Sequence, residues 1–398
     1  MTSMRPSVRL RPKVDARRIL RGAPWVYSNE LVTDRRTKAL APGTIATLED
    51  AERTPIATVA VNPNSKIIAR VLDQSADASI DRDWLADRLK AAIALREMAF
   101  DAPFYRLIHA EADGLPGVII DRFGDALVVQ PNAAWADVLF DDLVAALQKT
   151  TGAETIVKNA SGRARGLEGL DDVSEVVVGS LNGPVPVPMN GAIYMADLLG
   201  GQKTGLFFDQ RPNHAFVAGL SSGQDILDVF SHVGGFALAA LAAGAKTATS
   251  VDGSEAALDL AKAGAEAMGV SETFATIKGD AFDVMADLGQ AGRTFGTVIC
   301  DPPAFAPHKG ALDAGLRAYE NVARLASPLV NAGGTLTLCS CSHAADLRQF
   351  RTASVRGIGR AGRRAQILRT GFAGPDHPTH PHLAESGYLK SVTFRLLP

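Results

Sequence analysis

The spacing of hydrophobic positions at the start of the chain is typical of short β-strands. Three apolar runs are separated by turn residues such as Pro42-Gly43, and they cover 43–48, 56–61 and 67–72. Residues 81–99 then carry apolar side chains at helical spacing, and Asp81 can cap the start of that helix. We therefore expect a small β domain over residues 1–75, followed by a helix that enters a second domain.

The second domain is expected to be a mixed α/β domain over residues 76–189. Two apolar runs flank a turn that contains Gly124, which predicts a β-hairpin. A helix over 135–149 and a strand over 155–158 are expected next. The proline-rich stretch 182–188 is predicted to contain little regular structure and to mark a domain boundary.

From about Asn190 onward the pattern alternates between strands and helices. Strands are predicted at 225–230, 247–251, 273–278, 297–300 and 334–340, with intervening helices at 236–243, 254–269 and 312–326. Such alternation predicts a parallel sheet with right-handed crossovers and a site at the carboxyl ends of its strands. We therefore expect an α/β, Rossmann-like domain over residues 190–398.

A glycine-containing turn after the first of these strands is the first candidate binding feature. The strand carries Asp228 and Phe230, Ser231 follows, and a helix begins at the pair Gly234-Gly235. Glycines allow a ligand to approach the backbone closely. The spacing differs from the GxGxxG of dinucleotide-binding enzymes. The turn therefore favours a ligand that is not bound through phosphate.

Acidic residues follow the next two strands. Asp252 comes 18 residues after Gly234, where a carboxylate can accept hydrogen bonds from both ribose hydroxyls. Asp280 follows the third strand, where its carboxylate or the adjacent backbone can meet an adenine amino group. Taken singly, each aspartate is more often a helix cap or a turn residue. Together with the glycine turn, they indicate a nucleoside with a positive centre, and S-adenosylmethionine (SAM) is that ligand.

The segment Asp301-Pro302-Pro303 closes the fourth strand. Prolines restrict the backbone, so they can aim the Asp301 carboxylate into a cleft, where it can bind a base edge. The simpler alternative is a rigid turn with a surface aspartate. Methylases of exocyclic amines have an aromatic residue directly after the two prolines, whereas this chain has Ala304 there and Phe305 one position later. The segment therefore weighs against amino methylation.

Cysteines at the end of the fifth strand suggest methylation at pyrimidine C5. Addition of a thiolate to C6 makes C5 enamine-like, so that C5 can attack a sulfonium methyl group. A lone cysteine is more often a small buried hydrophobic residue. Alternation places Cys339 and Cys341 on the same side of the strand. We prefer Cys341 because it lies nearer the strand end, and we expect Cys300 to be part of the core.

Composition excludes several other classes of protein. Apolar residues make up 46% and charged residues 21%, so global disorder is not expected. Apolar runs are shorter than the roughly 20 residues that span a bilayer, and the start has no secretory signal; we expect no membrane association. Three cysteines without zinc-ligand spacing predict a reduced cytoplasmic enzyme with no metal site.

Charge is distributed unevenly although the net charge is only −2. The first forty residues contain ten basic residues and three acidic ones, a net charge of +7. Lys and Arg neutralise phosphates and release counterions, so this region can bind nucleic acid, but a solvated tail explains it equally well. Seven arginines between 348 and 369 leave a similar choice between an RNA groove and a charged helix surface.

These motifs resemble those of the three-domain ribosomal RNA cytosine-C5 methyltransferases of the large bacterial subunit. The resemblance covers nearly the whole chain, and its strongest elements are Lys203-Thr204-Gly205, Asp209-Gln210-Arg211, Phe230-Ser231, Gly234-Gly235-Phe236, Val251-Asp252, Asp301-Pro302-Pro303, Ser340-Cys341-Ser342, Asp376-His377-Pro378 and Tyr388-Leu389-Lys390. It implies a PUA-like RNA-binding domain, a middle α/β domain and a class I methyltransferase domain, with 23S rRNA as the partner, and it allows a homodimer.

The resemblance also implies roles for individual residues. Cys341 would attack cytosine C6, and Asp301 would hold the base. The residues expected to contact SAM are Asp209, Arg211, Asp228, Phe230, Ser231, Gly234, Asp252, Gly253, Ser254, Asp280, Ala281 and Asp301.

The chain departs from the family pattern at three places. Ala304 stands where lysine is frequent, His343 where glycine is usual, and His232 where tyrosine is usual. The alternatives are therefore methylation of another base or another RNA, an RNA-binding assembly factor with an inactive methylase core, and a small-molecule methyltransferase. The intact acids and Cys341 argue against the second alternative, and the +7 charge argues against the third.

Overall fold

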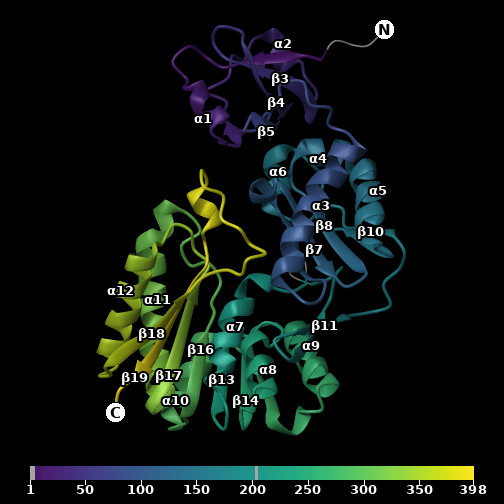
Figure 1. Cartoon of the computed structure of the whole chain (residues 1–398). Coiled ribbons are helices and arrows are strands. Elements are labelled where there is room, and N and C mark those ends of the chain that lie inside the picture. The colour runs from purple at the N-terminus through teal and green to yellow at the C-terminus, as the bar shows by residue number, and fades with distance from the viewer. Residues whose placement is uncertain (1–4, 202–204) are drawn as a thin grey trace. The chain divides into compact units, whose positions relative to one another are not determined.

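The computed structural model describes residues 5–201 and 205–398, so Lys203 and Thr204 of the motif lie outside the described residues. The chain divides into two compact units. The first contains the chain up to Asn182 and two short later segments, and the second contains the remainder. Figure 1 follows both along the chain.

The first unit begins with a five-stranded sheet in the order β1-β3-β4-β5-β2, in which only β1 and β3 pair in parallel. Its elements are β1 (Ser7–Arg9), α1 (Ala16–Leu20), β2 (Trp25–Val26), α2 (Arg35–Lys38), β3 (Thr44–Glu49), β4 (Pro55–Val61) and β5 (Ala69–Asp73). The three apolar runs of the sequence form β3, β4 and β5. Their buried side chains form one core, together with Leu10 and Ile19.

A second five-stranded sheet follows in the order β10-β9-β8-β7-β6. Its elements are α3 (Arg82–Ala99), β6 (Phe104–His109), β7 (Val118–Phe123), β8 (Ala126–Pro131), α4 (Ala134–Val138), α5 (Phe140–Thr151), β9 (Thr155–Lys158), α6 (Arg163–Glu168) and β10 (Glu175–Val178). The single helix predicted over 135–149 is wrong. Leu139 leaves the helical region at φ −99° and ψ 22°, which separates α4 from α5.

The prediction of little regular structure over 182–188 is also wrong, because a hairpin of β11 (Val185–Met189) and β12 (Ala192–Ala196) occupies this region. Val187 and Met189 are buried, whereas Pro186 and Pro188 point outward from the same strand. Proline is tolerated in an edge strand where its missing N–H is not needed for pairing. The alternation of buried and exposed residues along 185–189 therefore forms a strand in spite of the two prolines.

The second unit is built on a seven-stranded sheet in the order β15-β14-β13-β16-β17-β19-β18. Its further elements are α7 (Arg211–Ala218), β13 (Asp225–Val229), α8 (Gly235–Ala242), β14 (Thr247–Asp252), α9 (Glu255–Ala267), β15 (Phe274–Lys278), α10 (Ala281–Gln290), β16 (Phe295–Cys300), α11 (Leu312–Ala326), β17 (Val330–Ser340), α12 (Leu347–Arg360), β18 (Ala365–Gly371) and β19 (Lys390–Leu396). Strands β13 to β17 pair in parallel, and β19 is antiparallel to both neighbours.

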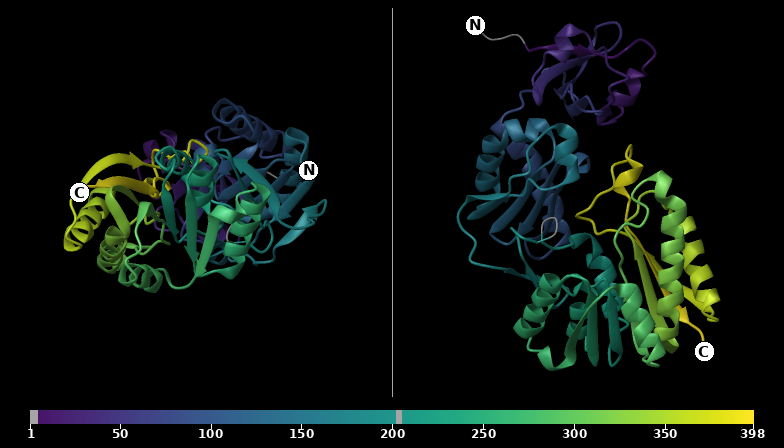
Figure 2. Two further views of the ribbon diagram at one scale, coloured as in Figure 1. Left: turned by 90° about the horizontal axis from the view of Figure 1, so that it is seen from below. Right: turned by 180° about the vertical axis from the view of Figure 1, so that it is seen from behind.

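Both faces of this sheet are covered, as Figures 1 and 2 show. Side chains of α7 and α8 pack on one face, and those of α10, α11 and α12 pack on the other. All six residues of β16 are buried, which accounts for its mostly apolar sequence. The chain runs outward from β13 to β15 and then returns to β16. The carboxyl ends of β13 and β16 therefore form a topological switch point, where ligands bind in open α/β sheets.

Among the described residues, no helix has both the length and the hydropathy required to cross a membrane.

Candidate active site

The turn after β13 has an unusual backbone conformation. Phe230, His232 and Gly234 adopt positive φ angles of 63°, 49° and 79°. Only glycine takes this conformation without strain, so the two non-glycine residues each cost about 1–3 kcal/mol. Hydrogen bonds fix the turn: Ser231 N donates to Val251 O at 3.0 Å, and Gly234 N donates to Ser231 O at 2.8 Å. A turn that is strained yet firmly held is typical of a functional site.

Asp252 lies beside this turn at the end of β14. Its Oδ2 accepts a hydrogen bond from His232 N at 2.9 Å, and its Oδ1 accepts one from Ser254 N at 2.9 Å. The Ser254 hydroxyl in turn caps α9 by accepting from Ala257 N at 3.2 Å. Each carboxylate oxygen has a second acceptor position. The geometry is therefore compatible with the predicted ribose contact, and it fixes the carboxylate in place.

Asp280 serves as a helix cap. Its Oδ1 accepts from Phe282 N at 2.9 Å and from Asp283 N at 3.3 Å at the start of α10, and the residue is exposed. The next residue, Ala281, is buried, whereas Gly253 after β14 is exposed. The capping role that the sequence left open is therefore present, and the predicted adenine contact at this place stays a prediction.

Asp228 is fully buried at the end of β13 and its hydrogen bonding is incomplete. Its Oδ2 accepts from Ala237 N at 3.0 Å, whereas its Oδ1 has no hydrogen-bond partner among the described residues. The buried Ser231 hydroxyl is in the same situation. Because buried polar atoms normally have partners, these two atoms fit a polar ligand that completes their hydrogen bonding. The residues present are thus suited to hold SAM.

Burial raises the pKa of Asp228 to about 8, and the charges of Asp301 and Asp252 act in the same direction. The hydrogen bond from Ala237 N and the backbone of Phe236 oppose this rise without cancelling it. Three carboxyl groups from the ends of β13, β14 and β16 are therefore close enough to influence one another. Such a cluster attracts a cationic ligand.

Asp301 follows β16 and is half-buried. Its backbone N donates to Val229 O at 3.1 Å, which places it beside the end of β13. Its Oδ2 accepts a hydrogen bond from Gln210 Nε2 at 2.9 Å. Gln210 belongs to the motif Asp209-Gln210-Arg211, but the sequence alone predicts no role for it. The one feature of the sequence that draws attention to Gln210 is its place in this motif.

The neighbours of Gln210 contact the segment that precedes β19. Asp209 Oδ2 accepts from the Tyr388 hydroxyl at 2.6 Å, and Asp209 O accepts from Gly374 N at 3.0 Å. Burial lowers the pKa of Arg211, and the charge of Asp376 opposes that effect. These side chains therefore hold two distant segments together, and their predicted contact with SAM stays a prediction.

The three cysteines have different environments. Cys300 and Cys339 are buried, whereas Cys341 is half-buried. Burial raises the pKa of both buried thiols, and Cys339 Sγ donates to Ser391 Oγ at 3.4 Å. Strand β17 ends at Ser340, so the alternation that groups Cys339 with Cys341 does not extend to Cys341. Burial alone therefore distinguishes Cys341 from the other two.

The residue after Cys341 fixes its position. The Ser342 hydroxyl accepts from Ala306 N at 2.9 Å and is hydrogen-bonded to the Tyr319 hydroxyl at 2.7 Å. Lys390 Nζ donates to Ser342 O at 2.6 Å. Burial lowers the pKa of Lys390 to about 8, and Cys341 acts in the opposite direction. The Cys341 backbone is thus tied to the loop that follows Asp301.

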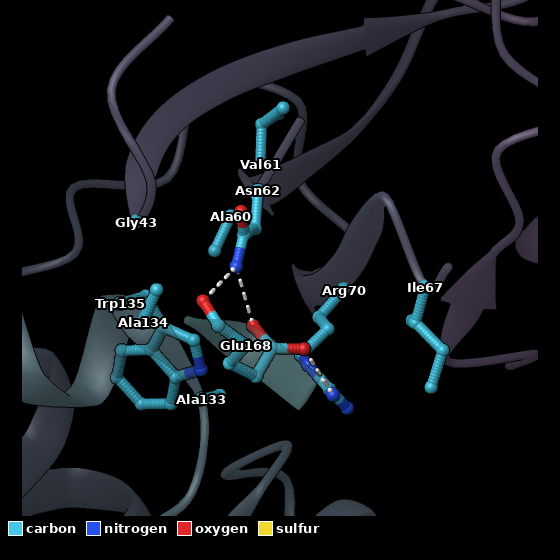
Figure 3. A pocket seen from close by; sticks show the side chains of 10 residues that line it. All are labelled: Gly43, Ala60, Val61, Asn62, Ile67, Arg70, Ala133, Ala134, Trp135 and Glu168. Atoms are coloured by element: carbon cyan, nitrogen blue, oxygen red, sulfur yellow. Dashed lines mark hydrogen bonds and ion pairs between the residues drawn. The ribbon is translucent and has the colours of Figure 1, made fainter. Parts of the chain in front are cut away.

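A small pocket in the first unit lies between Trp135 of α4 and the β domain (Figure 3). In it the Glu168 carboxylate accepts from Asn62 Nδ2 at 2.9 Å and from Ser65 Oγ at 2.8 Å, and it pairs with Arg70 Nη2 at 3.0 Å. Glu168 is 4% exposed and both of its oxygens have partners. The arrangement joins α6 to the β domain and is structural.

Comparison with known proteins defines the class first. Residues 8–74 match a PUA-like domain, and residues 167–355 match the S-adenosylmethionine-dependent methyltransferases. The fold agrees: a protein from Streptococcus mutans classed as a SAM-dependent methyltransferase superposes with a TM-score of 0.80 at 19% identity, over 98% of this chain and 100% of that chain. The chain is thus a SAM-dependent methyltransferase with a PUA-like domain, and SAM is its cofactor.

The relatives give the particular family. Ribosomal RNA large subunit methyltransferase I of Erwinia tasmaniensis is 34% identical over 384 residues, which covers 95% of this chain and 96% of the relative. The protein of the same name from Vibrio cholerae is 34% identical over 385 residues, with coverages of 94% and 95%. The chain belongs to the family of ribosomal RNA large subunit methyltransferases I.

Proposed function

We propose that this chain methylates C5 of a cytosine in 23S rRNA, with Cys341 as the nucleophile that adds to cytosine C6. The names of the relatives support a large-subunit rRNA substrate. The motif resemblance supports cytosine C5 as the target atom.

The observation that carries the proposal is the environment of Cys341. Of the three cysteines, it alone is not fully buried, and it lies at the carboxyl end of β17. The neighbouring strand β16 ends at Cys300, directly before Asp301. A thiol and a carboxylate therefore extend from adjacent strand ends toward the same edge of the sheet, which is the arrangement that pyrimidine C5 chemistry requires.

The proposed chemistry assigns one step to each residue. Bound SAM supplies an electrophilic methyl group. The Cys341 thiolate forms a bond to C6, which makes C5 nucleophilic enough to take the methyl group. A proton acceptor then removes the C5 proton, which expels the thiolate and restores the pyrimidine ring. The Asp301 carboxylate holds the cytosine through the polar edge of its ring during these steps.

The position of Phe305 supports this reaction over amino methylation. Its ring packs against Tyr319 with 5.0 Å between ring centroids, and against Phe282 at 6.1 Å and Phe230 at 6.4 Å. The Phe305 ring is thus occupied by aromatic residues of the protein. Stacking on a flipped base, which amino methylation would require of it, would need these contacts to rearrange.

The same proposal assigns RNA binding to the β domain and SAM binding to the strand ends. Basic side chains that are exposed in the first forty residues include Lys13, Arg17, Arg21, Arg35, Arg36 and Lys38. They can neutralise phosphates without losing a buried contact. Asp228 and Ser231, with their incomplete hydrogen bonding, and Asp252, with its fixed carboxylate, are the proposed SAM contacts.

Mass spectrometry of rRNA nucleosides tests the proposal. The gene is deleted in its host, and the strain is complemented with wild type or with Cys341→Ser. We expect 5-methylcytidine at one 23S rRNA site to disappear on deletion and to return only with wild type. Loss of a methylated adenosine or guanosine instead would contradict the proposal.

A further inference from the structure

Gln210 lies at the centre of a chain of hydrogen bonds that ends on Asp301. The residue is 3% exposed, and its Nε2 donates to Asp301 Oδ2 across a separation of 91 positions in the sequence. Its amide also lowers the pKa of the buried Cys339 thiol of β17, against the rise that burial causes. Gln210 therefore lies close to two adjacent strands, β16 and β17.

The orientation of the Gln210 amide is fixed by Asn213. Asn213 Nδ2 donates to Gln210 Oε1 at 2.7 Å and to Phe372 O at 3.2 Å, and Asn213 is 2% exposed. A side-chain amide can be flipped end for end, but its oxygen must face a donor. Because Asn213 supplies that donor, the nitrogen of Gln210 has to face Asp301.

A neutral donor suits this position. Asp301 shares its surroundings with Asp228, and the SAM sulfonium carries a positive charge. A lysine or arginine in place of Gln210 would add a positive charge to the site that is proposed to bind this cation, and like charges repel. An amide orients the carboxylate without adding charge.

We propose that Gln210 is a positioning residue that holds the Asp301 carboxylate in its working orientation through this hydrogen-bond chain. The inference rests on the proposed function in one respect, since that function assigns Asp301 to the target base. It goes further by adding two buried amides, Gln210 and Asn213, to the machinery of the reaction.

Two substitutions separate positioning from a general structural role. Gln210→Met keeps nearly the same volume but removes the donor, and Gln210→Glu adds a carboxyl group that can donate only when it is protonated. A hydrogen bond to a charged group corresponds to roughly a 10- to 100-fold effect, so we expect kcat per SAM-binding site to fall by about that factor in both variants. Calorimetry counts the SAM-binding sites in each sample. Unfolded protein binds no SAM, so dividing by the number of sites removes its effect on the comparison.

The dependence on pH distinguishes the two variants. As the pH falls from 8 to 6, Gln210→Glu should regain activity relative to wild type, whereas Gln210→Met should not. The titratable groups that interact with Asp301 include Asp228, Cys300 and Cys339. All three are present in Gln210→Met, which adds no charge, so that variant shows their own contribution to the pH dependence. A structural defect would not produce this difference.

Gln349→Glu is the matched control, because it adds the same charge at the capping box of α12. It should keep wild-type kcat. Wild-type kcat in Gln210→Met, or equal losses in both Gln210 variants at every pH, would overturn the inference. If neither Gln210 variant folds, Asn213→Ala is measured instead. We expect this variant to lose kcat per SAM-binding site by a smaller factor. An unchanged kcat in Asn213→Ala would overturn the inference. All of these rates are measured for the nucleoside that the wild-type enzyme methylates, whichever nucleoside that is. The identity of the methylated nucleoside therefore tests the proposed function separately from the role of Gln210.

Discussion

Asp228 shows how a single buried carboxyl group can link cofactor binding to pH. Its pKa is raised to about 8 by burial and by the charges of Asp301 and Asp252. The group is therefore protonated in the neutral range and ionises as the pH passes about 8. A cationic ligand binds the ionised form more tightly, so its affinity should increase with pH and its binding should release a proton.

The prediction compares two ligands that differ in one charge. SAM carries a sulfonium and S-adenosylhomocysteine does not, while both carry the same amino group. From pH 6.5 to 9 we expect the affinity ratio of SAM to S-adenosylhomocysteine to rise several-fold, with about tenfold per pH unit as the upper limit for one proton. Titration calorimetry at several pH values measures it. Asp228→Asn should make the ratio independent of pH, and a constant ratio in wild type would contradict the linkage.

Cys341 permits a comparison with a closely spaced residue of the same type. Cys341→Ser should abolish methylation, because a hydroxyl is almost never ionised at neutral pH. Cys339→Ser should stay active and lose stability, on the order of 1–3 kcal/mol if the buried hydroxyl lacks a good partner. RNA with 5-fluorocytosine at the target should form a covalent adduct with wild type and Cys339→Ser, because fluorine cannot leave as the C5 proton does. An adduct with Cys341→Ser on a denaturing gel would disprove the assignment.

At the scale of elements, one buried ion pair joins α6 to the β domain. Glu168 receives two hydrogen bonds and the Arg70 charge while almost fully buried. Burial by itself raises the pKa of Glu168, but Arg70, Asn62 and Ser65 outweigh it, so that the pKa lies below its ordinary value of 4.5. A carboxyl group with a lowered pKa stabilises the fold above its ordinary pKa, and this contribution is lost as the pH falls through the folded-state pKa.

The stability of the first unit should therefore decrease in acid partly through Glu168. Glu168→Gln should lower the free energy of unfolding by about 1.5–3 kcal/mol at pH 7, because Arg70 loses one of its two carboxylate partners and keeps the other, Glu111. The difference between variant and wild type should shrink below pH 4.5. Urea unfolding at several pH values checks this. Glu97→Gln, a substitution at an exposed position of α3, is the control and should show neither effect.

The sequence predicts elements and strand ends better than it predicts contacts between distant segments. Strands β13 and β16 appear as apolar runs because both of their faces are buried. Asp252 and Asp301 are recognisable because they lie at the ends of predicted strands. The hairpin β11–β12 and strands β18 and β19 are missed, since their burial depends on partners elsewhere. The role of Gln210 is missed for the same reason, because its partner is 91 positions away.

For the whole molecule, the uneven charge distribution suggests how RNA is held, but the fold limits how this can be tested. Removal of residues 1–75 would delete Asn62, Ser65 and Arg70, which are the partners of Glu168, and would take Ala60 and Leu72 out of the core of the middle domain. The remaining middle domain would be destabilised, so weaker RNA binding by that truncation would be ambiguous. Charge reversal at exposed positions leaves the core intact and is the better experiment.

Arg17→Glu and Arg35→Glu are suitable substitutions because both side chains are exposed on short helices of the β domain. If each arginine contacts a phosphate, the slope of log affinity against log salt should become shallower by about 0.7–0.9 per residue. Affinity for a 23S rRNA fragment should fall, whereas SAM affinity should stay unchanged.

Lys246→Glu is the matched control, because Lys246 is exposed at the amino end of β14, opposite the strand ends that carry the site. Fluorescence anisotropy between 50 and 300 mM salt gives the slopes. Equal slopes for wild type, control and both variants would show that the β domain does not anchor the RNA through these charges.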